Sequence, residues 1–142
     1  MDNIDVVHAI ERAWDTHDEG ALDSLIAPDF QAHTPGSELM DAGLEGAKNA
    51  HRASMQAMPD RRNTVHDIFG EGDYVVSQIS MDATNTGGLP WIGVPANGAK
   101  IKGVGWITIY RLQEGKVVET WAQMEVPKLM QQLGAMPGAG EV

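Results

Sequence analysis

Residues 100–124 read KIKGVGWITIYRLQEGKVVETWAQM, and this stretch decides the fold. β-Branched and aromatic residues dominate on both sides of Glu114 and Gly115, which is typical of two strands joined by a tight hairpin. Gly103 and Gly105 lie inside the first of these strands, where glycine commonly marks a bend or a close backbone approach. We therefore expect a bent hairpin formed by residues 100–112 and 116–124.

Two further strands are expected upstream, at residues 64–69 and 74–84, with a turn at residues 70–73. In the longer one, Val75, Ile79, Met81 and Ala83 alternate with polar side chains, so only one face of the sheet meets an apolar core. Another turn is indicated by Asn97 followed by glycine. Four consecutive strands predict an antiparallel meander.

The first half of the chain has the period of helices instead. Ile4, Val7, Ile10 and Trp14 recur at spacings of three and four, which predicts a helix over residues 3–17 with Asp2 or Asn3 as its cap. A second short helical face around residues 22–26 stops at Pro28, and residues 30–33 are expected to be extended.

A further helix is expected at residues 44–58, where Pro59 ends it, and a last short helix is expected between Pro127 and Gly134. Residues 34–43 lack periodicity and are interpreted as a loop that could cover a pocket. Helices in the first half and strands in the second predict an α+β fold, a curved antiparallel sheet wrapped around helices as a cone with an interior pocket. We expect a single domain over residues 1–134 and a mobile tail over residues 135–142.

Composition excludes several classes of function. The 142-residue chain has a formal net charge of −10, which repels a phosphate backbone, so no nucleic-acid partner is expected. The short basic pairs, Arg61 with Arg62 and Lys100 with Lys102, are interpreted as solvated sheet edges or turns. There is no secretory leader pattern and no apolar run long enough for a membrane span, so we expect a cytoplasmic protein without a membrane partner.

Cofactor and metal signatures are also missing from the sequence. It contains no cysteine, which rules out disulfides and thiolate zinc sites. The histidines show neither paired helical spacing nor an HxH strand pattern, and no GxGxxG, phosphate-binding loop or GxSxG elbow is present. We therefore predict no metal and no cofactor.

Several stretches, taken in order, resemble the SnoaL-like polyketide cyclases, a family of ketosteroid-isomerase-like cones. The similarity extends over residues 4–134 and rests on LIAPDFQAH (25–33), MPDRRNTVHDIFGEGDYVV (58–76), TNTG (84–87), GVPANGAKI (93–101), GKVVETW (115–121) and LMQQLG (129–134). The resemblance implies a small hydrophobic ligand, a cofactor-free reaction and a homodimer or higher homo-oligomer.

The resemblance also implies a mechanism. In these cyclases an acidic side chain one or four residues after the tryptophan of the last strand is thought to serve as the acid/base of an intramolecular aldol ring closure. This sequence has Ala122 at the first place and Glu125 at the second. A further departure is Asn85, where relatives often carry histidine. Glu125 is therefore the expected acid/base group, with the alternative that it caps the helix starting near Pro127.

The remaining candidate residues surround this proposed centre. His33 and His51 are candidate catalytic partners, although each could equally be a structural histidine. Candidate substrate-binding residues are those that could donate hydrogen bonds or form the wall of a flat apolar pocket, although core packing alone explains most of the tryptophans and methionines: Asn85, Gln123, Trp91, Trp106, Trp121, Met55 and Met81.

Two other functions stay open at this point. The same cone could support a different reaction, such as that of an isomerase, a dehydratase or an epoxide hydrolase. It could also be a non-catalytic protein that binds a small hydrophobic molecule, because the acid at position 122 is missing.

Overall fold

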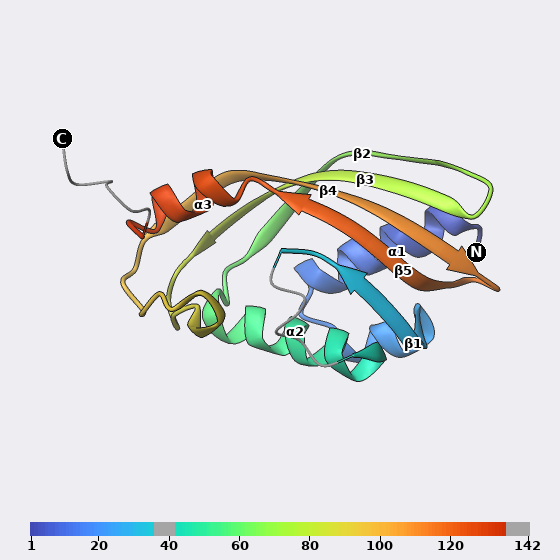
Figure 1. Ribbon diagram of the computed structural model, residues 1–142, viewed down its shortest axis with the longest axis horizontal. Coiled ribbons are helices and arrows are strands. Elements are labelled where there is room, and N and C mark those ends of the chain that lie inside the picture. Colours follow the sequence, from blue (N-terminus) through green and yellow to red (C-terminus); the bar gives the residue numbers. More distant parts are fainter. Residues whose placement is uncertain (36–41, 136–142) are drawn as a thin grey trace.

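The computed structural model describes residues 1–35 and 42–135 (Figure 1). Its elements run in the order α1 (Asn3–Asp15), η1 (Glu19–Ser24), β1 (Ile26–His33), α2 (Gly43–Ala57), β2 (Arg62–Glu71), β3 (Tyr74–Thr84), η3 (Pro90–Ile92), β4 (Lys100–Gln113), β5 (Lys116–Met124) and α3 (Val126–Gln132). Apart from Ala135, the tail expected to be mobile lies outside the described residues, and so does most of the loop expected at residues 34–43.

The sheet has five strands in the order β1-β5-β4-β3-β2, and Figure 1 shows it curving over α1 and α2. The α+β class and the meander from β2 to β5 are confirmed, since these strands pair antiparallel. A fifth strand, β1, joins the predicted meander and pairs parallel with β5, so the sheet is mixed and His33 lies opposite Trp121. Local periodicity could not show this, because β1 and β5 are joined by a long crossover that contains the rest of the sheet.

Helix α1 begins as predicted and ends earlier. The Asp2 carboxylate accepts a hydrogen bond from the Asp5 backbone amide at 2.8 Å. The Asp5 carboxylate in turn accepts one from the Asp2 backbone amide, which completes a capping box. The predicted end at residue 17 is two residues too late, since the helix ends at Asp15 and His17 has a φ of 58°. The buried stripe of α1 contains Val7 and Ile10, as expected from their spacing, and it also contains Glu11.

The bend predicted in β4 is present. Gly103 has a φ of 61°, a left-handed conformation that favours glycine, and the pairing of β3 with β4 shifts register nearby. The Gly103 amide donates to the Asp82 carboxylate at 2.8 Å, which satisfies the group that the bulge removes from the ladder. Curvature at this point turns the sheet toward α3.

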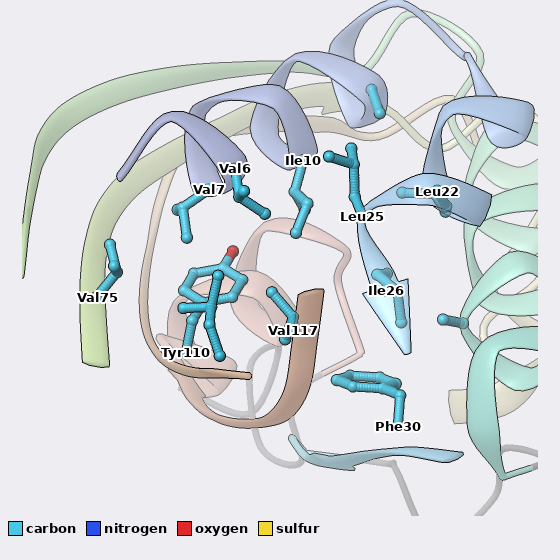
Figure 2. Packing of buried hydrophobic residues seen from close by; sticks show 13 residues of the cluster. Val6, Val7, Ile10, Leu22, Leu25, Ile26, Phe30, Val75, Tyr110 and Val117 are labelled. Atoms are coloured by element: carbon cyan, nitrogen blue, oxygen red, sulfur yellow. The ribbon is translucent and has the colours of Figure 1, made fainter. Parts of the chain in front are cut away.

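Two apolar clusters pack at opposite ends of the concave face. The first joins α1 and β1 to the sheet and contains Val7, Ile10, Phe30 and Val117 (Figure 2). The second joins β3, β4 and α3 around Met81, Leu89, Val104 and Leu129. None of the helices in the described part of the chain is long and apolar enough to cross a membrane.

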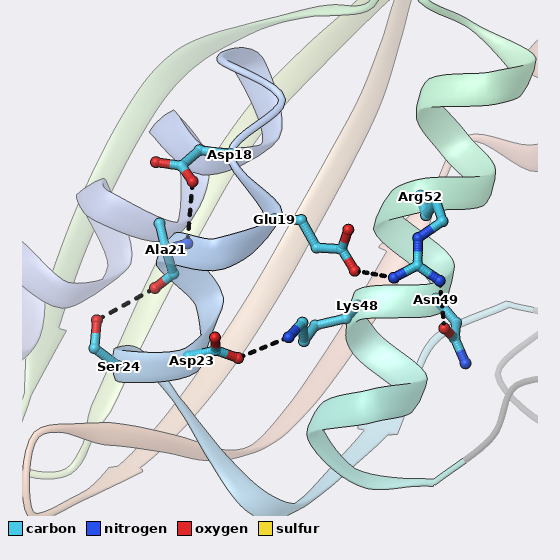
Figure 3. A network of polar contacts seen from close by, with 8 residues as sticks. All are labelled: Asp18, Glu19, Ala21, Asp23, Ser24, Lys48, Asn49 and Arg52. Atoms are coloured by element: carbon cyan, nitrogen blue, oxygen red, sulfur yellow. Dashed lines mark hydrogen bonds and ion pairs between the residues drawn. The ribbon is translucent and has the colours of Figure 1, made fainter.

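Helix α2 is tied to η1 by two ion pairs. Lys48 donates to Asp23 at 2.9 Å, and Arg52 pairs with Glu19 (Figure 3). Exposed pairs of this kind contribute little to the stability of a fold, because water and salt screen them. They connect the exposed sides of α2 and η1.

The convex face of the sheet exposes large apolar side chains, among them Phe69 at 54% and Ile107 at 49% exposure. Such patches often mark contacts with other proteins. The predicted homo-oligomer is not tested by a single chain and stays a prediction, which sedimentation of the purified protein would decide.

Candidate functional site

A cavity of about 420 Å³ lies between α1, α2 and the concave face of the sheet. Its wall is mostly apolar and comes from both clusters, for example Phe30 from the first and Met81 and Leu129 from the second. Thr34 and Pro35 also line it, at the start of the segment expected to cover a pocket. A cavity of this size suits a small molecule of about two or three rings.

Among the described residues that line this cavity, Glu11 contributes the acidic group, and it is only 6% exposed. The Tyr110 hydroxyl donates to Glu11 Oε1 at 2.7 Å, and the Ser77 hydroxyl donates to the same oxygen at 3.3 Å. In Figure 2 the Tyr110 hydroxyl points toward α1. Burial raises the pKa of Glu11, and the two hydrogen bonds oppose this only in part.

The second oxygen of Glu11 is open to the cavity. Both hydrogen bonds to the carboxyl end on Oε1. Among the described residues, no fully buried side-chain oxygen or nitrogen lacks a hydrogen-bond partner. Oε2, which has no such partner, is therefore accessible from the cavity and can accept or give up a proton there. Burial also raises the pKa of Tyr110 well above its usual value, so Tyr110 stays a neutral donor.

Because its pKa is raised in the folded protein, Glu11 should make the free energy of unfolding fall as pH rises. Above pH 4.5, the usual pKa of a glutamate, the carboxyl at position 11 is ionised in the unfolded chain but still protonated in the folded protein. The free energy of unfolding therefore decreases with pH until the raised pKa of the folded protein is passed. We expect Glu11→Gln to gain stability relative to the wild type across this window and then level off. Urea unfolding at a series of pH values measures this, and a difference independent of pH would contradict it.

Arg61 is the basic group of the cavity and is only 8% exposed. Its Nη1 donates to the Ser54 hydroxyl at 2.9 Å and its Nε donates to the Asn63 side chain at 3.3 Å. Burial lowers the pKa of Arg61 to about 10, so it stays charged at neutral pH. The interpretation of Arg61 as a solvated residue is wrong, because the chain turns inward before β2 and places it under the sheet.

Of the predicted substrate-binding residues, Trp91, Trp106 and Met81 line the cavity. Met55 lies on α2 and is half-buried outside the lining. His51 is 1% exposed, and its Nε2 donates to the Ala13 carbonyl at 3.1 Å. Burial lowers the pKa of His51, so the ring is neutral. It packs edge-on against Trp14 at 4.8 Å, which helps to hold this cavity residue in place.

Trp121 and Gln123 lie on the opposite face of β5. They alternate with Thr120, Ala122 and Met124, which line the cavity, so they point away from it.

His33 stacks on Trp121 with ring centroids 5.5 Å apart, and its Nε2 lies 2.7 Å from Glu119 Oε2. Glu119 also accepts from Arg111, and the hydrogen bonds from His33 and Arg111 lower its pKa. His33 thus pairs with a carboxylate on the outer face and is absent from the cavity lining.

Glu125 precedes α3 and is exposed. Its Oε1 accepts a hydrogen bond from the Gly105 amide at 3.0 Å, and its side chain makes no capping bond to α3. The carboxylate lies close over Gly105, since a Cβ there would lie 2.3 Å from Glu125 Oε1 and the Glu125 side chain would have to shift. Glu125 is absent from the cavity lining, so the structure does not bring it together with His33 or His51.

Asn85 is completely buried and fully engaged by its own loop. Its side-chain nitrogen donates to the Pro95 carbonyl and to Asn97, and its oxygen accepts from the Gly88 amide, all at 2.9 Å. Asn85 is also absent from the cavity lining.

The polar centre of the cavity was missed by the sequence analysis. Glu11 follows Val7 by four residues and precedes Trp14 by three, so an acid on the apolar stripe of α1 was visible. Tyr110 and Arg61 carried no comparable signal. Among the described residues, no three His, Asp or Glu side chains gather in a way that could hold a metal ion.

Comparison with known proteins agrees with this architecture. TsrD from Streptomyces laurentii is 26% identical, with a TM-score of 0.83 over 93% of this chain and 94% of that chain. IdmH from Streptomyces antibioticus, a proposed polyketide cyclase, is 27% identical, with a TM-score of 0.79 over 94% of this chain and 99% of that chain. A SnoaL-like polyketide cyclase from Agrobacterium tumefaciens, 15% identical, shares the fold with a TM-score of 0.77 over 94% and 99% of the two chains.

A search of curated protein sequences finds no match. The family model of the SnoaL-like polyketide cyclases, in contrast, matches residues 4–133, which is nearly the whole chain. With the cone-like sheet, the helices on its concave side and the cavity between them, this match shows that the chain belongs to the SnoaL-like polyketide cyclase family.

Proposed function

We propose that this protein is a cofactor-free acid/base enzyme that acts on a small, largely apolar carbonyl compound, and that Glu11 moves the proton. The observation that carries the proposal is the buried carboxyl of Glu11, held by Tyr110 and open to an apolar cavity. A carboxyl whose pKa is raised by burial approaches the range in which proton transfer is efficient near neutral pH. Family membership supports a ring-closing reaction as the chemistry.

The reaction needs only proton transfer and one new carbon–carbon bond. Ionised Glu11 removes a proton from a carbon next to a substrate carbonyl, and the electron pair forms an enolate. The enolate carbon attacks a second carbonyl carbon in the same molecule, and the resulting alkoxide takes the proton back from Glu11. The cavity contributes by holding a flexible substrate in a folded, reactive arrangement.

The positions of Ala122, on β5, and of Glu125, just after it, favour Glu11 over Glu125 as the acid/base group. Ala122 occupies the cavity-facing position next to Trp121 and has no proton to transfer. Glu125 is exposed and bonded to the Gly105 amide. The sequence-based role of Glu125 stays a prediction, and substitution of Glu11 by glutamine, compared with the same change at Glu125, separates the two assignments.

A second candidate function is the binding of a small hydrophobic molecule without chemistry. Ala122 favours it, because the cavity-facing position where relatives are thought to carry an acid is apolar here. Retention of an unchanged ligand in the cavity, unaffected by Glu11→Gln, would support this function. Isomerase, dehydratase and epoxide hydrolase reactions on the same site would be told apart by product analysis.

Occupation of the cavity can be tested at two adjacent positions. We expect Ala122→Phe to weaken binding of the bicyclic ketone 2-tetralone by about tenfold or more, because the new ring enters the cavity. Gln123→Phe is the matched control, since that side chain faces away. Calorimetric titration measures both affinities. Equal affinities in the two variants would contradict this location of the ligand.

A further inference from the structure

Arg61 is a buried cation that forms no ion pair with any of the residues that the structure describes. Its hydrogen bonds to Ser54 and Asn63 go to neutral oxygens. Glu11 and Asp15 act on it only through space. The Asp15 carboxylate is engaged instead by the Asn63 amide at 2.6 Å. A buried charge without a counter-ion destabilises the folded protein, and this favours the binding of an anion from outside the chain.

The surroundings of Arg61 leave one edge of its guanidinium available. The guanidinium carbon lies 4.9 Å from the ring centroid of Trp14 and 5.9 Å from that of Trp106, and both rings line the cavity. The hydrogen bonds of Arg61 use Nε and Nη1, which leaves Nη2 without a partner. Since no fully buried side-chain nitrogen in the described residues is unsatisfied, Nη2 is accessible, and Arg61 itself lines the cavity.

We propose that the ligand of this cavity carries a carboxylate that Arg61 binds, with the apolar part of the ligand lying against Trp14 and Trp106. Arginine is suited to this role because its planar donors match the geometry of a carboxylate, and such bonds strengthen when shielded from water. Ser54 and Asn63 fix the orientation of the guanidinium before binding. The inference deepens the proposed function and rests on it only in placing the ligand in the same cavity.

The test compares 2-naphthoate with 2-naphthamide, two flat molecules of nearly equal shape that differ in charge. Calorimetric titration at neutral pH should show that the wild type binds the carboxylate at least about tenfold more tightly than the amide. Arg61→Met should bind the two about equally, because it retains apolar bulk and loses the charge. Arg61→Lys should recover part of the preference. Circular dichroism checks that each variant is folded.

Each other outcome of the titration overturns the inference. If the wild type bound 2-naphthoate and 2-naphthamide equally well, Arg61 would not bind a carboxylate of the ligand. Its charge would then serve only to stabilise negative charge that develops during a reaction. If Arg61→Met still preferred 2-naphthoate, the carboxylate would bind at another residue. If the wild type bound neither probe, flat aromatic carboxylates would be excluded as ligands. Glu11→Gln separates the two proposals: it should retain the preference for naphthoate whether or not Glu11 transfers protons in catalysis.

Discussion

Replacing Glu11 by glutamine is expected to slow carbon-proton transfer in this protein by about 10²–10⁴-fold. Glutamine has nearly the same shape and keeps an oxygen that can accept from Tyr110 at the position of Oε1. It cannot take or release a proton at the position of Oε2, which opens to the cavity. Deuterium exchange at the acidic carbon of 2-tetralone in D₂O, followed by NMR, measures this step without the natural substrate.

The matched control for this experiment is Glu125→Gln, which changes the same functional group at an exposed position. We expect it to leave the exchange rate nearly unchanged. The wild-type rate should rise with pH through the raised pKa of Glu11, because the ionised carboxylate is the base. Exchange that persists in Glu11→Gln and disappears in Glu125→Gln would reverse the assignment and restore the acid predicted from the sequence.

The second large effect is expected on stability. Asn85→Ala should lower the free energy of unfolding by about 3 kcal/mol, because the Gly88 amide and the Pro95 carbonyl lose their partners inside the protein. Asn85→Asp should also be destabilising, since a carboxylate oxygen would replace the donor that faces Pro95 and Asn97. Urea denaturation followed by circular dichroism measures both losses.

The control is Gln123→Ala, another residue predicted to bind substrate but exposed on the outer face. Its substitution should change the free energy of unfolding by no more than about 0.5 kcal/mol. If Asn85→Ala instead retained full stability and weakened binding of 2-tetralone, Asn85 would be a ligand-binding residue, as the sequence analysis expected, and its role in the loop would be secondary.

Features of this fold that depend on neighbouring residues are visible in the sequence, and features that depend on distant residues are not. Strand β5 and strand β3 were predicted at their observed bounds, because alternation and hairpin turns are properties of neighbouring residues. The parallel pairing of β1 was not predicted, because its partner β5 is far along the chain. In the site, Trp106 and Met81 line the cavity, whereas Trp121 could be assigned to a face only once the register of β5 was known.

By itself the sequence determined the α+β class, the meander, the caps and turns, and the family resemblance, since these follow from short-range patterns and their order along the chain. Only the tertiary structure decided which polar groups meet in the cavity. Glu11 and Tyr110 are 99 residues apart, and they meet because α1 lies across the concave face of a bent sheet. Arg61 looks like its neighbour Arg62 in the sequence, yet only Arg61 is buried. Contacts of this kind depend on packing between distant elements, which no local pattern encodes.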